Sequence, residues 1–233
     1  MTRHDVRGVP PMGLSARFRD RAEAGRTLAS LLADRYAGRD DIIVLGLPRG
    51  GVPVAFEVAR ALGAPLDVFV VRKLGVPGQP ELAMGAVASG GTRVLNRYVM
   101  RLAGVVEDDL DRVTASERAV LDRREAAYRG ERQPLDVAGK VVIVVDDGLA
   151  TGASMRAAVE ALRQAGPSEL VVAVPVAPPD SCDELGRVAD AVVCARTPEP
   201  FFAVGHWYDD FSEVTDNDVR RVLAEAASHR PDT

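Results

Sequence analysis

The sequence predicts an α/β fold in which a parallel sheet is covered by helices on both faces. Short aliphatic runs alternate with segments of helical periodicity, beginning with DIIVLGLP at 41–48 and VPVAFEVARALGA at 52–64. Strand–helix–strand alternation of this kind implies parallel pairing through right-handed crossovers. Hydrophobic residues make up 47% of the 233 residues, which is enough to bury the core of such a domain.

The first part of the chain is expected to form a helix, a strand, a second helix and a second strand. Apolar residues recur at helical spacing in RFRDRAEAGRTLASLLADRYAG (17–38), which ends in glycine. The strand at 41–48 follows, and the next helix has Pro53 in its first turn and Gly63 at its end. PLDVFVVRKL (65–74) is predicted to be the second strand of the sheet.

The middle of the chain departs from this alternation. MGAVASGGTRV (84–94) predicts two short strands about the Gly90-Gly91 pair. VEDDLDRVTASERAVLDRREAAYRG (106–130) predicts a long charged helix with a sparse apolar face, which we interpret as a solvated surface helix.

The second half of the chain supplies the remaining strands. GKVVIVVDD (139–147) predicts a strand and GASMRAAVEALRQAG (152–166) predicts its helix. Two further strands are expected at ELVVAVPVA (169–177) and ADAVVCAR (189–196). A short helix is expected between them at DSCDELGRV (180–188). We therefore expect one domain over 1–233, with a core of about 42–196, a helical insertion at 96–130, and flanking segments at 1–38 and 197–233.

Composition excludes several classes of function. Lys and Arg number 29 and Asp and Glu number 34, so the net charge of −5 argues against a nucleic-acid partner. The sequence contains neither the apolar core of a signal peptide nor a membrane-spanning run, and we expect a cytoplasmic protein without a membrane partner. Cys182 and Cys194 lie outside any metal-ligand spacing and are expected to be small buried hydrophobic side chains.

The chemistry is concentrated in VVIVVDDGLATGASM (141–155). Five aliphatic residues are followed by Asp146 and Asp147, then by a loop of small residues that directly precedes a helix. Such a loop exposes backbone N–H groups at a helix N-terminus and predicts a phosphate cradle, although an N-cap with glycine turn chemistry would by itself explain Ser154 or Thr151. Two adjacent carboxylates there require a partner such as sugar hydroxyls or hydrated Mg²⁺. The spacing matches neither a Walker A loop nor a Rossmann fingerprint.

This stretch resembles the phosphoribosyl-diphosphate (PRPP) signature of the type I phosphoribosyltransferases. The resemblance implies a type I phosphoribosyltransferase-like parallel sheet with a small hood formed by the flanking segments, together with the helical insertion. It implies that Asp146 and Asp147 bind the ribose 2′- and 3′-hydroxyls. It also implies that the 5′-phosphate lies in a loop made of Ala150, Thr151, Gly152, Ala153 and Ser154.

Two further loops fit the resemblance. LPRGG resembles the family's pyrophosphate loop, which often contains a non-proline cis peptide. In this sequence the loop contains Arg49, Gly50 and Gly51. VRKLG brings Arg72 and Lys73 to the end of the expected second strand, where they would neutralise the leaving pyrophosphate, although a pair of solvated charges is about as consistent with position alone. The implied catalytic set is Asp146, Asp147, Arg49 and Lys73. RKLGVPGQPELAMGAVASGG (72–91) resembles a subgroup of bacterial predicted phosphoribosyltransferases.

The acceptor is less constrained than the donor. Ala150 stands where 6-oxopurine members of the family carry an aspartate, which disfavours that type, whereas adenine and uracil types carry alanine. Leu149, Trp207 and Tyr208 are the candidate acceptor-binding residues, and the two aromatic side chains are equally consistent with packing of the hood.

The sequence therefore predicts a transferase that moves ribose 5-phosphate from PRPP to a nitrogen acceptor, with a nucleobase as the expected acceptor and pyrophosphate as product. Mg²⁺ is the expected cofactor, held through PRPP and by Asp146 and Asp147, without further protein ligands. The partners are PRPP and a small planar acceptor, and a homodimer is compatible with the sequence. The alternatives are a non-catalytic regulator that binds PRPP or a nucleotide, and an enzyme in which water or phosphate replaces the base.

Overall fold

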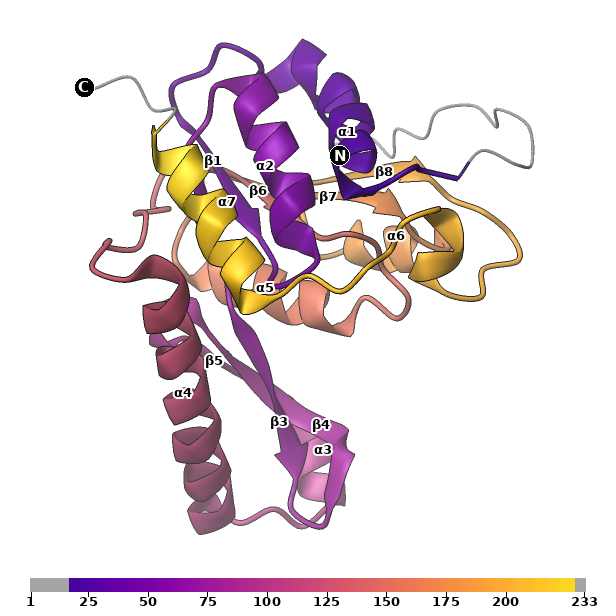
Figure 1. Cartoon of the computed structure of the whole chain (residues 1–233). Coiled ribbons are helices and arrows are strands. Elements are labelled where there is room, and N and C mark those ends of the chain that lie inside the picture. Colours follow the sequence, from indigo (N-terminus) through magenta and orange to yellow (C-terminus); the bar gives the residue numbers. More distant parts are fainter. Residues whose placement is uncertain (1–16, 229–233) are drawn as a thin grey trace.

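The computed structural model describes residues 17–228 and is built on a five-stranded sheet in which every pair of neighbours is parallel (Figure 1). The predicted α/β fold is thereby confirmed. The order across the sheet is β2 (Leu66–Val68), β1 (Ile42–Gly46), β6 (Val141–Val145), β7 (Glu169–Val176) and β8 (Ala191–Arg196). Strands β1 and β6 are buried throughout, as near-continuous aliphatic runs in a sheet covered on both faces should be.

Helices cover both faces of the sheet because alternate side chains of each strand point to opposite sides. Ile42 and Val44 pack against α1 (Arg21–Tyr36) and α2 (Gly51–Leu62). Ile43 and Leu45 pack on the other face with α5 (Ala153–Gln164) and α6 (Pro179–Leu185). The expected helices are thus confirmed, including a left-handed Gly63 at the end of α2.

The prediction of one strand over 65–74 is wrong. Strand β2 ends at Val68, and the backbone N–H of Val70 donates to the Ser89 hydroxyl, 2.8 Å away, outside the parallel sheet. Beyond this point β3 (Val71–Val76) pairs antiparallel with β4 (Gln79–Ala88), which pairs with β5 (Arg93–Leu95). Arg72 and Lys73 therefore lie on a second, three-stranded sheet and not at the carboxyl end of a parallel strand.

The two strands expected at 84–94 are present as the end of β4 and β5, joined by a 3₁₀ turn, η1 (Ser89–Gly91). After β5 come α3 (Arg97–Leu102) and α4 (Glu107–Arg129). We call β3, β4, β5, α3 and α4 the arm, because Figure 1 shows them extending together away from the parallel sheet. Helix α4 is largely exposed, and its sparse apolar face includes the buried Leu110 and Leu121.

The arm is tied to the parallel sheet by a buried ion pair at the end of α4. The Arg129 guanidinium donates from Nε to the Asp67 carboxylate at 3.0 Å and from Nη2 to the Val68 carbonyl at 2.7 Å. The side chains of Arg129 and Asp67 are 7% and 10% exposed. The last helix, α7 (Asp216–Ser228), packs against both α2 and α4.

A disulfide joins Cys182 of α6 to Cys194 of β8, with a Cα–Cα separation of 6.9 Å. The expectation of two separate buried thiols is corrected on this point, although both residues are buried in the core as predicted. The two cysteines meet because α6 immediately precedes β8 and packs on the face toward which Cys194 points. None of the helices within residues 17–228 is long and apolar enough to cross a membrane.

Candidate active site

The two adjacent aspartates lie at the carboxyl end of the central strand β6, as predicted. Both are half-buried, and the backbone N–H of Asp147 donates to the Asp146 carboxylate at 2.9 Å. Carboxyl ends of parallel strands are where open α/β sheets bind their ligands. The rigid strand therefore delivers both carboxylates to the edge of the sheet at which a ligand site is expected.

The LPRGG turn after β1 packs directly on the acid pair. Its Pro48–Arg49 peptide bond is cis, and the Leu47 backbone N–H donates to the Val145 carbonyl at 2.9 Å. A Cβ atom added to Gly50 would lie 1.9 Å from Asp147 Oδ2. A Cβ atom on Gly51 would lie 2.7 Å from the Val145 carbonyl oxygen. Both glycines are therefore required by close approach to the acidic strand end, and a simple surface turn does not explain them.

Arg21 completes this cluster, and the sequence analysis did not assign it. Its Nε donates to Asp147 Oδ2 at 2.9 Å, and its Nη1 donates to the Ser212 carbonyl at 2.8 Å. Its guanidinium lies over the Phe211 ring, 4.0 Å from the centroid. The side chains of Arg21 and Asp147 are only 12% and 15% exposed. The available signal was Asp20, an N-cap that fixes the helix start and so places Arg21 in the first turn.

Burial dominates the electrostatics of the acid pair. Burial raises the pKa of Asp146 well above its ordinary value, and the adjacent charge of Asp147 raises it further. Burial also raises the pKa of Asp147, while the nearby Arg21 guanidinium opposes that rise. Two carboxyl groups with raised pKa values are stabilised by a cation or by hydroxyl donors, as a sugar would supply.

Tyr208 supports the acidic loop from the C-terminal segment. Its hydroxyl donates to the Asp147 carbonyl at 2.6 Å, and the residue is buried. Its ring centroid lies 5.6 Å from that of Phe18 and 5.0 Å from that of Phe211. Tyr208 therefore lies at the site, as expected, but its ring is packed between two other rings.

The other aromatic candidates occupy different positions around the site. Trp207 is half-buried, and its Nε1 is buried without a hydrogen-bond partner in the part of the chain that the structure describes. Phe202 is 77% exposed and makes an edge contact with His206 at 6.1 Å between ring centroids. Leu149 is buried, and its backbone N–H donates to the Val176 carbonyl.

The predicted phosphate loop leads directly into α5. Gly152 has a φ of +67°, and the helix begins at Ala153, so the first backbone N–H groups of α5 point toward the loop. Thr151 and Ser154 are exposed, and the Ala150 carbonyl accepts from the Ser181 hydroxyl at 2.9 Å. This arrangement of small residues at a helix N-terminus is typical of anion sites.

The three predicted pyrophosphate cations are not brought together. Arg49 Nη2 lies 2.6 Å from Glu213 Oε1, beside the acid pair. Arg72 pairs with Glu117 of α4 at 2.7 Å, and Lys73 pairs across the antiparallel sheet with Glu81 at 3.2 Å. Arg72 thus connects two elements of the arm, whereas Lys73 remains 46% exposed.

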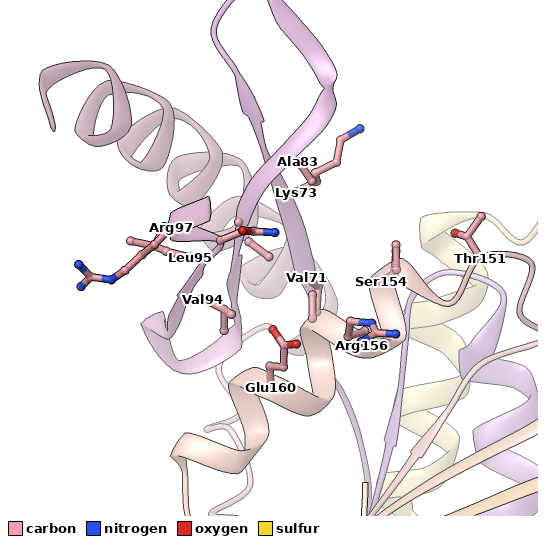
Figure 2. A pocket seen from close by; sticks show the side chains of 15 residues that line it. Val71, Lys73, Ala83, Val94, Leu95, Arg97, Thr151, Ser154, Arg156 and Glu160 are labelled. Atoms are coloured by element: carbon pink, nitrogen blue, oxygen red, sulfur yellow. The ribbon is translucent and has the colours of Figure 1, made fainter. Parts of the chain in front are cut away.

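A cavity of about 630 Å³ lies between α5 and the antiparallel sheet, next to the phosphate loop (Figure 2). Thr151, Ala153 and Ser154 line it from the loop, and Lys73 lines it from β3. The acid pair does not line it. Within residues 17–228 no group of three or more His, Cys, Asp or Glu side chains could hold a metal ion.

The chain is similar in sequence and fold to several known proteins. A sequence profile of the family described as "Phosphoribosyl transferase domain" matches residues 18–204. A Mycobacterium tuberculosis protein named "Putative phosphoribosyl transferase Rv0571c" is 47% identical over 209 residues, which are 90% of this chain and 47% of that protein. The chain therefore spans about half the length of this curated relative and of its counterpart in a second strain.

Two further proteins cover most of the chain. The crystal structure of TT1426 from Thermus thermophilus is 50% identical in sequence, with a TM-score of 0.81, over 90% of this chain and 98% of that one. A Clostridium acetobutylicum protein named "Bifunctional protein PyrR" is 31% identical over 163 residues, which are 69% of this chain and 72% of that protein.

Proposed function

Because the chain belongs to the phosphoribosyl transferase family, we propose that it transfers ribose 5-phosphate from PRPP to a nitrogen acceptor and releases pyrophosphate. The bond from ribose C1′ to the pyrophosphate oxygen breaks, and a bond from C1′ to the acceptor nitrogen forms. The observation that carries the proposal is the acid pair, Asp146 and Asp147, held between a glycine turn and the loop at the N-terminus of α5.

The two carboxylates are proposed to bind the ribose 2′- and 3′-hydroxyls. Burial raises the pKa of both carboxyl groups, which means that their charged forms are poorly solvated. Hydrogen bonds donated by the ribose hydroxyls would stabilise these charged forms. A transition state with positive charge on the ribose ring would be stabilised by the same two groups. Arg21 donates to the Asp147 carboxylate and Tyr208 donates to the Asp147 carbonyl, so both are proposed as positioning residues.

The phosphates are proposed to bind on either side of this ribose. The loop from Ala150 to Ser154 would hold the 5′-phosphate through backbone N–H groups and the hydroxyls of Thr151 and Ser154. Arg49 and the turn at Gly50 and Gly51 would contact the pyrophosphate, with Lys73 reaching from the arm. Arg72 is proposed to serve the packing of α4 instead, because it pairs with Glu117.

Mg²⁺ fits the acid pair as a partner shared with the substrate. Asp146 and Asp147 are adjacent carboxylates whose raised pKa values a cation would lower, and Mg²⁺ often binds through one or two carboxylates together with substrate phosphates. Bound there, it would neutralise charge on the leaving pyrophosphate. The protein's own residues orient the ribose and hold the two phosphate groups apart.

The acceptor is proposed to be a small planar base that lies against the 201–207 segment. That segment packs over the acidic loop, since a Cβ atom on Gly148 would lie 2.5 Å from a Val204 methyl group. Phe202 and His206 leave exposed ring surface there, whereas Tyr208 is packed against Phe18 and Phe211. Stacking on exposed rings suits any planar heterocycle and does not by itself select one base.

The test is pyrophosphate release from PRPP and Mg²⁺ with a panel of nucleobases and amines, together with calorimetric titration of PRPP. We expect turnover with at least one base, and loss of PRPP binding in the double variant Asp146→Asn with Asp147→Asn. The matched control changes a second adjacent acid pair, Asp108→Asn with Asp109→Asn, on the first turn of α4, where Asp108 is exposed and Asp109 pairs with Arg112. Unchanged PRPP affinity in the first double variant would refute the proposal.

A non-catalytic regulator that binds PRPP is the second candidate. The observation that favours it is the dispersal of the pyrophosphate cations, because Arg72 is held by Glu117 and Lys73 stands on the arm. Tight PRPP binding without pyrophosphate release for any acceptor in the panel would support this candidate over the enzyme.

A further inference from the structure

The short helix α6 holds one side of the predicted phosphate loop. The Ser181 hydroxyl donates to the Ala150 carbonyl at 2.9 Å, and Ser181 is buried. A Cβ atom added to Gly152 would lie 3.8 Å from a Leu185 methyl carbon, which is an ordinary van der Waals distance. Helix α6 therefore meets the loop at two points, through a buried hydrogen bond and through an apolar side chain.

The disulfide attaches α6 covalently to the parallel sheet. Cys182 directly follows Ser181, and it is bonded to Cys194 of β8 across a sequence separation of 12. A helix of seven residues is too short to be stable by itself, so its position depends on its tertiary contacts. Because the bond closes a short loop between α6 and β8, it restricts how far Ser181 can move away from Ala150.

An ion pair also joins α6 to α5, but it is exposed. Arg156 and Glu184 are 2.7 Å apart, and their side chains are 40% and 52% exposed, so the pair contributes little to holding the helix. The buried contacts are more important. Cys182 and Leu185 lie in the same core cluster as Leu149, which immediately precedes the loop. A displacement of α6 would therefore reach the loop through Ser181 and through this shared packing.

Reduction of the disulfide requires only a dithiol as co-reactant. The dithiol gives up two electrons and two protons, the bond between Cys182 and Cys194 breaks to two thiols, and the two sulfurs of the reductant form a disulfide. Both cysteines are buried, so the reductant reaches them when α6 opens locally. In the cytosol, the location expected from the sequence, disulfides are usually transient and serve catalysis or redox sensing.

We propose that the Cys182–Cys194 disulfide is a redox switch for the phosphate loop. In the oxidised protein the bond fixes α6, and Ser181 then holds residues 150–154 in the conformation that binds a phosphate group. Reduction frees α6, the loop loses order, and the phosphate-bearing ligand binds more weakly. The coupling itself follows from the contacts of Ser181 and Leu185, and only the identity of the ligand, PRPP, rests on the proposed function.

The coupling works in both directions. If oxidation raises the affinity for a ligand by some factor, the bound ligand shifts the equilibrium between thiols and disulfide toward the disulfide by the same factor. Saturating PRPP should therefore leave a larger fraction of the protein oxidised in a buffer that contains both dithiothreitol and its disulfide form. Thiol titration after acid quenching measures that fraction.

Amide hydrogen exchange tests the coupling without any ligand. Reduction with dithiothreitol should raise the exchange rate of amides 150–154 about fivefold or more, which corresponds to the loss of one hydrogen bond. Amides of the central strand β1 should stay unchanged and so show that the reduced protein is folded. Ser181→Ala should speed exchange of the loop already in the oxidised form, and reduction should then add less than in the parent protein. Equal exchange of 150–154 in both oxidation states of the parent protein would overturn the inference.

Calorimetric titration with PRPP and Mg²⁺ measures the effect on the ligand. The oxidised protein should bind PRPP about fivefold or more tightly than the reduced protein, and reoxidation should restore the affinity. The double variant Cys182→Ala with Cys194→Ala should bind PRPP as the reduced protein does and should not respond to dithiothreitol, which excludes a direct effect of the reagent.

Three results separate this switch from the proposed function. Equal PRPP affinity in the two oxidation states overturns the switch and leaves the proposed function intact. Two free thiols that do not form the bond in an oxidising buffer also overturn the switch. If PRPP binds neither form while reduction still speeds exchange at 150–154, the proposed function is refuted and the coupling between the disulfide and the loop stands.

Discussion

Replacing Arg21 with glutamine should destabilise the fold in a pH-dependent way. The Arg21–Asp147 pair joins the first turn of α1 to the end of β6 at 2.9 Å, with side chains 12% and 15% exposed. Removing the guanidinium leaves a poorly solvated carboxylate beside Asp146. Charge-assisted hydrogen bonds contribute roughly 1.5–3 kcal/mol, so we expect a loss of about 2 kcal/mol at pH 8. For a chain of this length that loss lowers Tm by about 6 °C.

The sign of the pH dependence follows from the raised pKa values of the acid pair. Since folding raises the pKa of Asp146 and Asp147, the folded chain binds more protons than the unfolded chain between the ordinary and the raised values. Their contribution to stability is therefore greatest at low pH and falls as the pH rises through that interval. Without Arg21 the pKa of Asp147 rises further, so the variant should be close to the parent protein at pH 5 and most destabilised at pH 8.

Thermal unfolding at a series of pH values measures this, and two controls bracket it. Arg21→Lys keeps the positive charge and should recover part of the stability at pH 8. Arg39→Gln removes an ion pair of 2.7 Å to Asp41 whose side chains are 39% and 36% exposed, and it should leave Tm nearly unchanged. Equal destabilisation of Arg21→Gln at pH 5 and pH 8, or none at either, would refute the reasoning.

Three further predictions concern the site and its surroundings. Gly50→Ala places a methyl group where Asp147 Oδ2 lies, so it should weaken PRPP binding in calorimetry by more than about tenfold, and unchanged affinity would contradict the close packing. Tyr208→Phe removes the donor to the Asp147 carbonyl and should cost about 1–2 kcal/mol in urea unfolding, with equal midpoints as the contrary result. Reduction of the Cys182–Cys194 disulfide should lower the free energy of unfolding by about 3 kcal/mol, and mass spectrometry showing two free thiols before reduction would exclude the bond.

The parts of the site that are contiguous in sequence could be predicted. The strand β6, Asp146, Asp147, the small loop and α5 follow one another within 141–164, so local pattern alone sets their order. In this stretch the aliphatic run, the charged residues at its end and the helical periodicity that follows all indicate the same local structure, a strand, a loop and a helix. The same applies to the turn at Gly50, where strand and helix signals flank the glycines.

Contacts between distant segments could not be predicted in this way. The Arg21–Asp147 pair links residues 126 positions apart, and RFRDR contains three arginines that local pattern does not distinguish. The run PLDVFVVRKL is continuously apolar from Val68 to Val71, so its transfer from one sheet to the other after Val68 leaves no mark in hydropathy. At the transfer, Val70 bonds to Ser89 through both its backbone N–H and its carbonyl, and these two residues lie 19 positions apart in the sequence.

The buried Arg129–Asp67 pair has a consequence for how this chain can vary. Asp67 stands just before the arm and Arg129 at its end, so the pair closes the arm into a loop whose two ends lie at one corner of the parallel sheet. A segment that leaves and returns at a single point adds little closure entropy when it is lengthened. The corner is thus a natural graft point, at which arms of different length can be exchanged while the five-stranded sheet keeps its register.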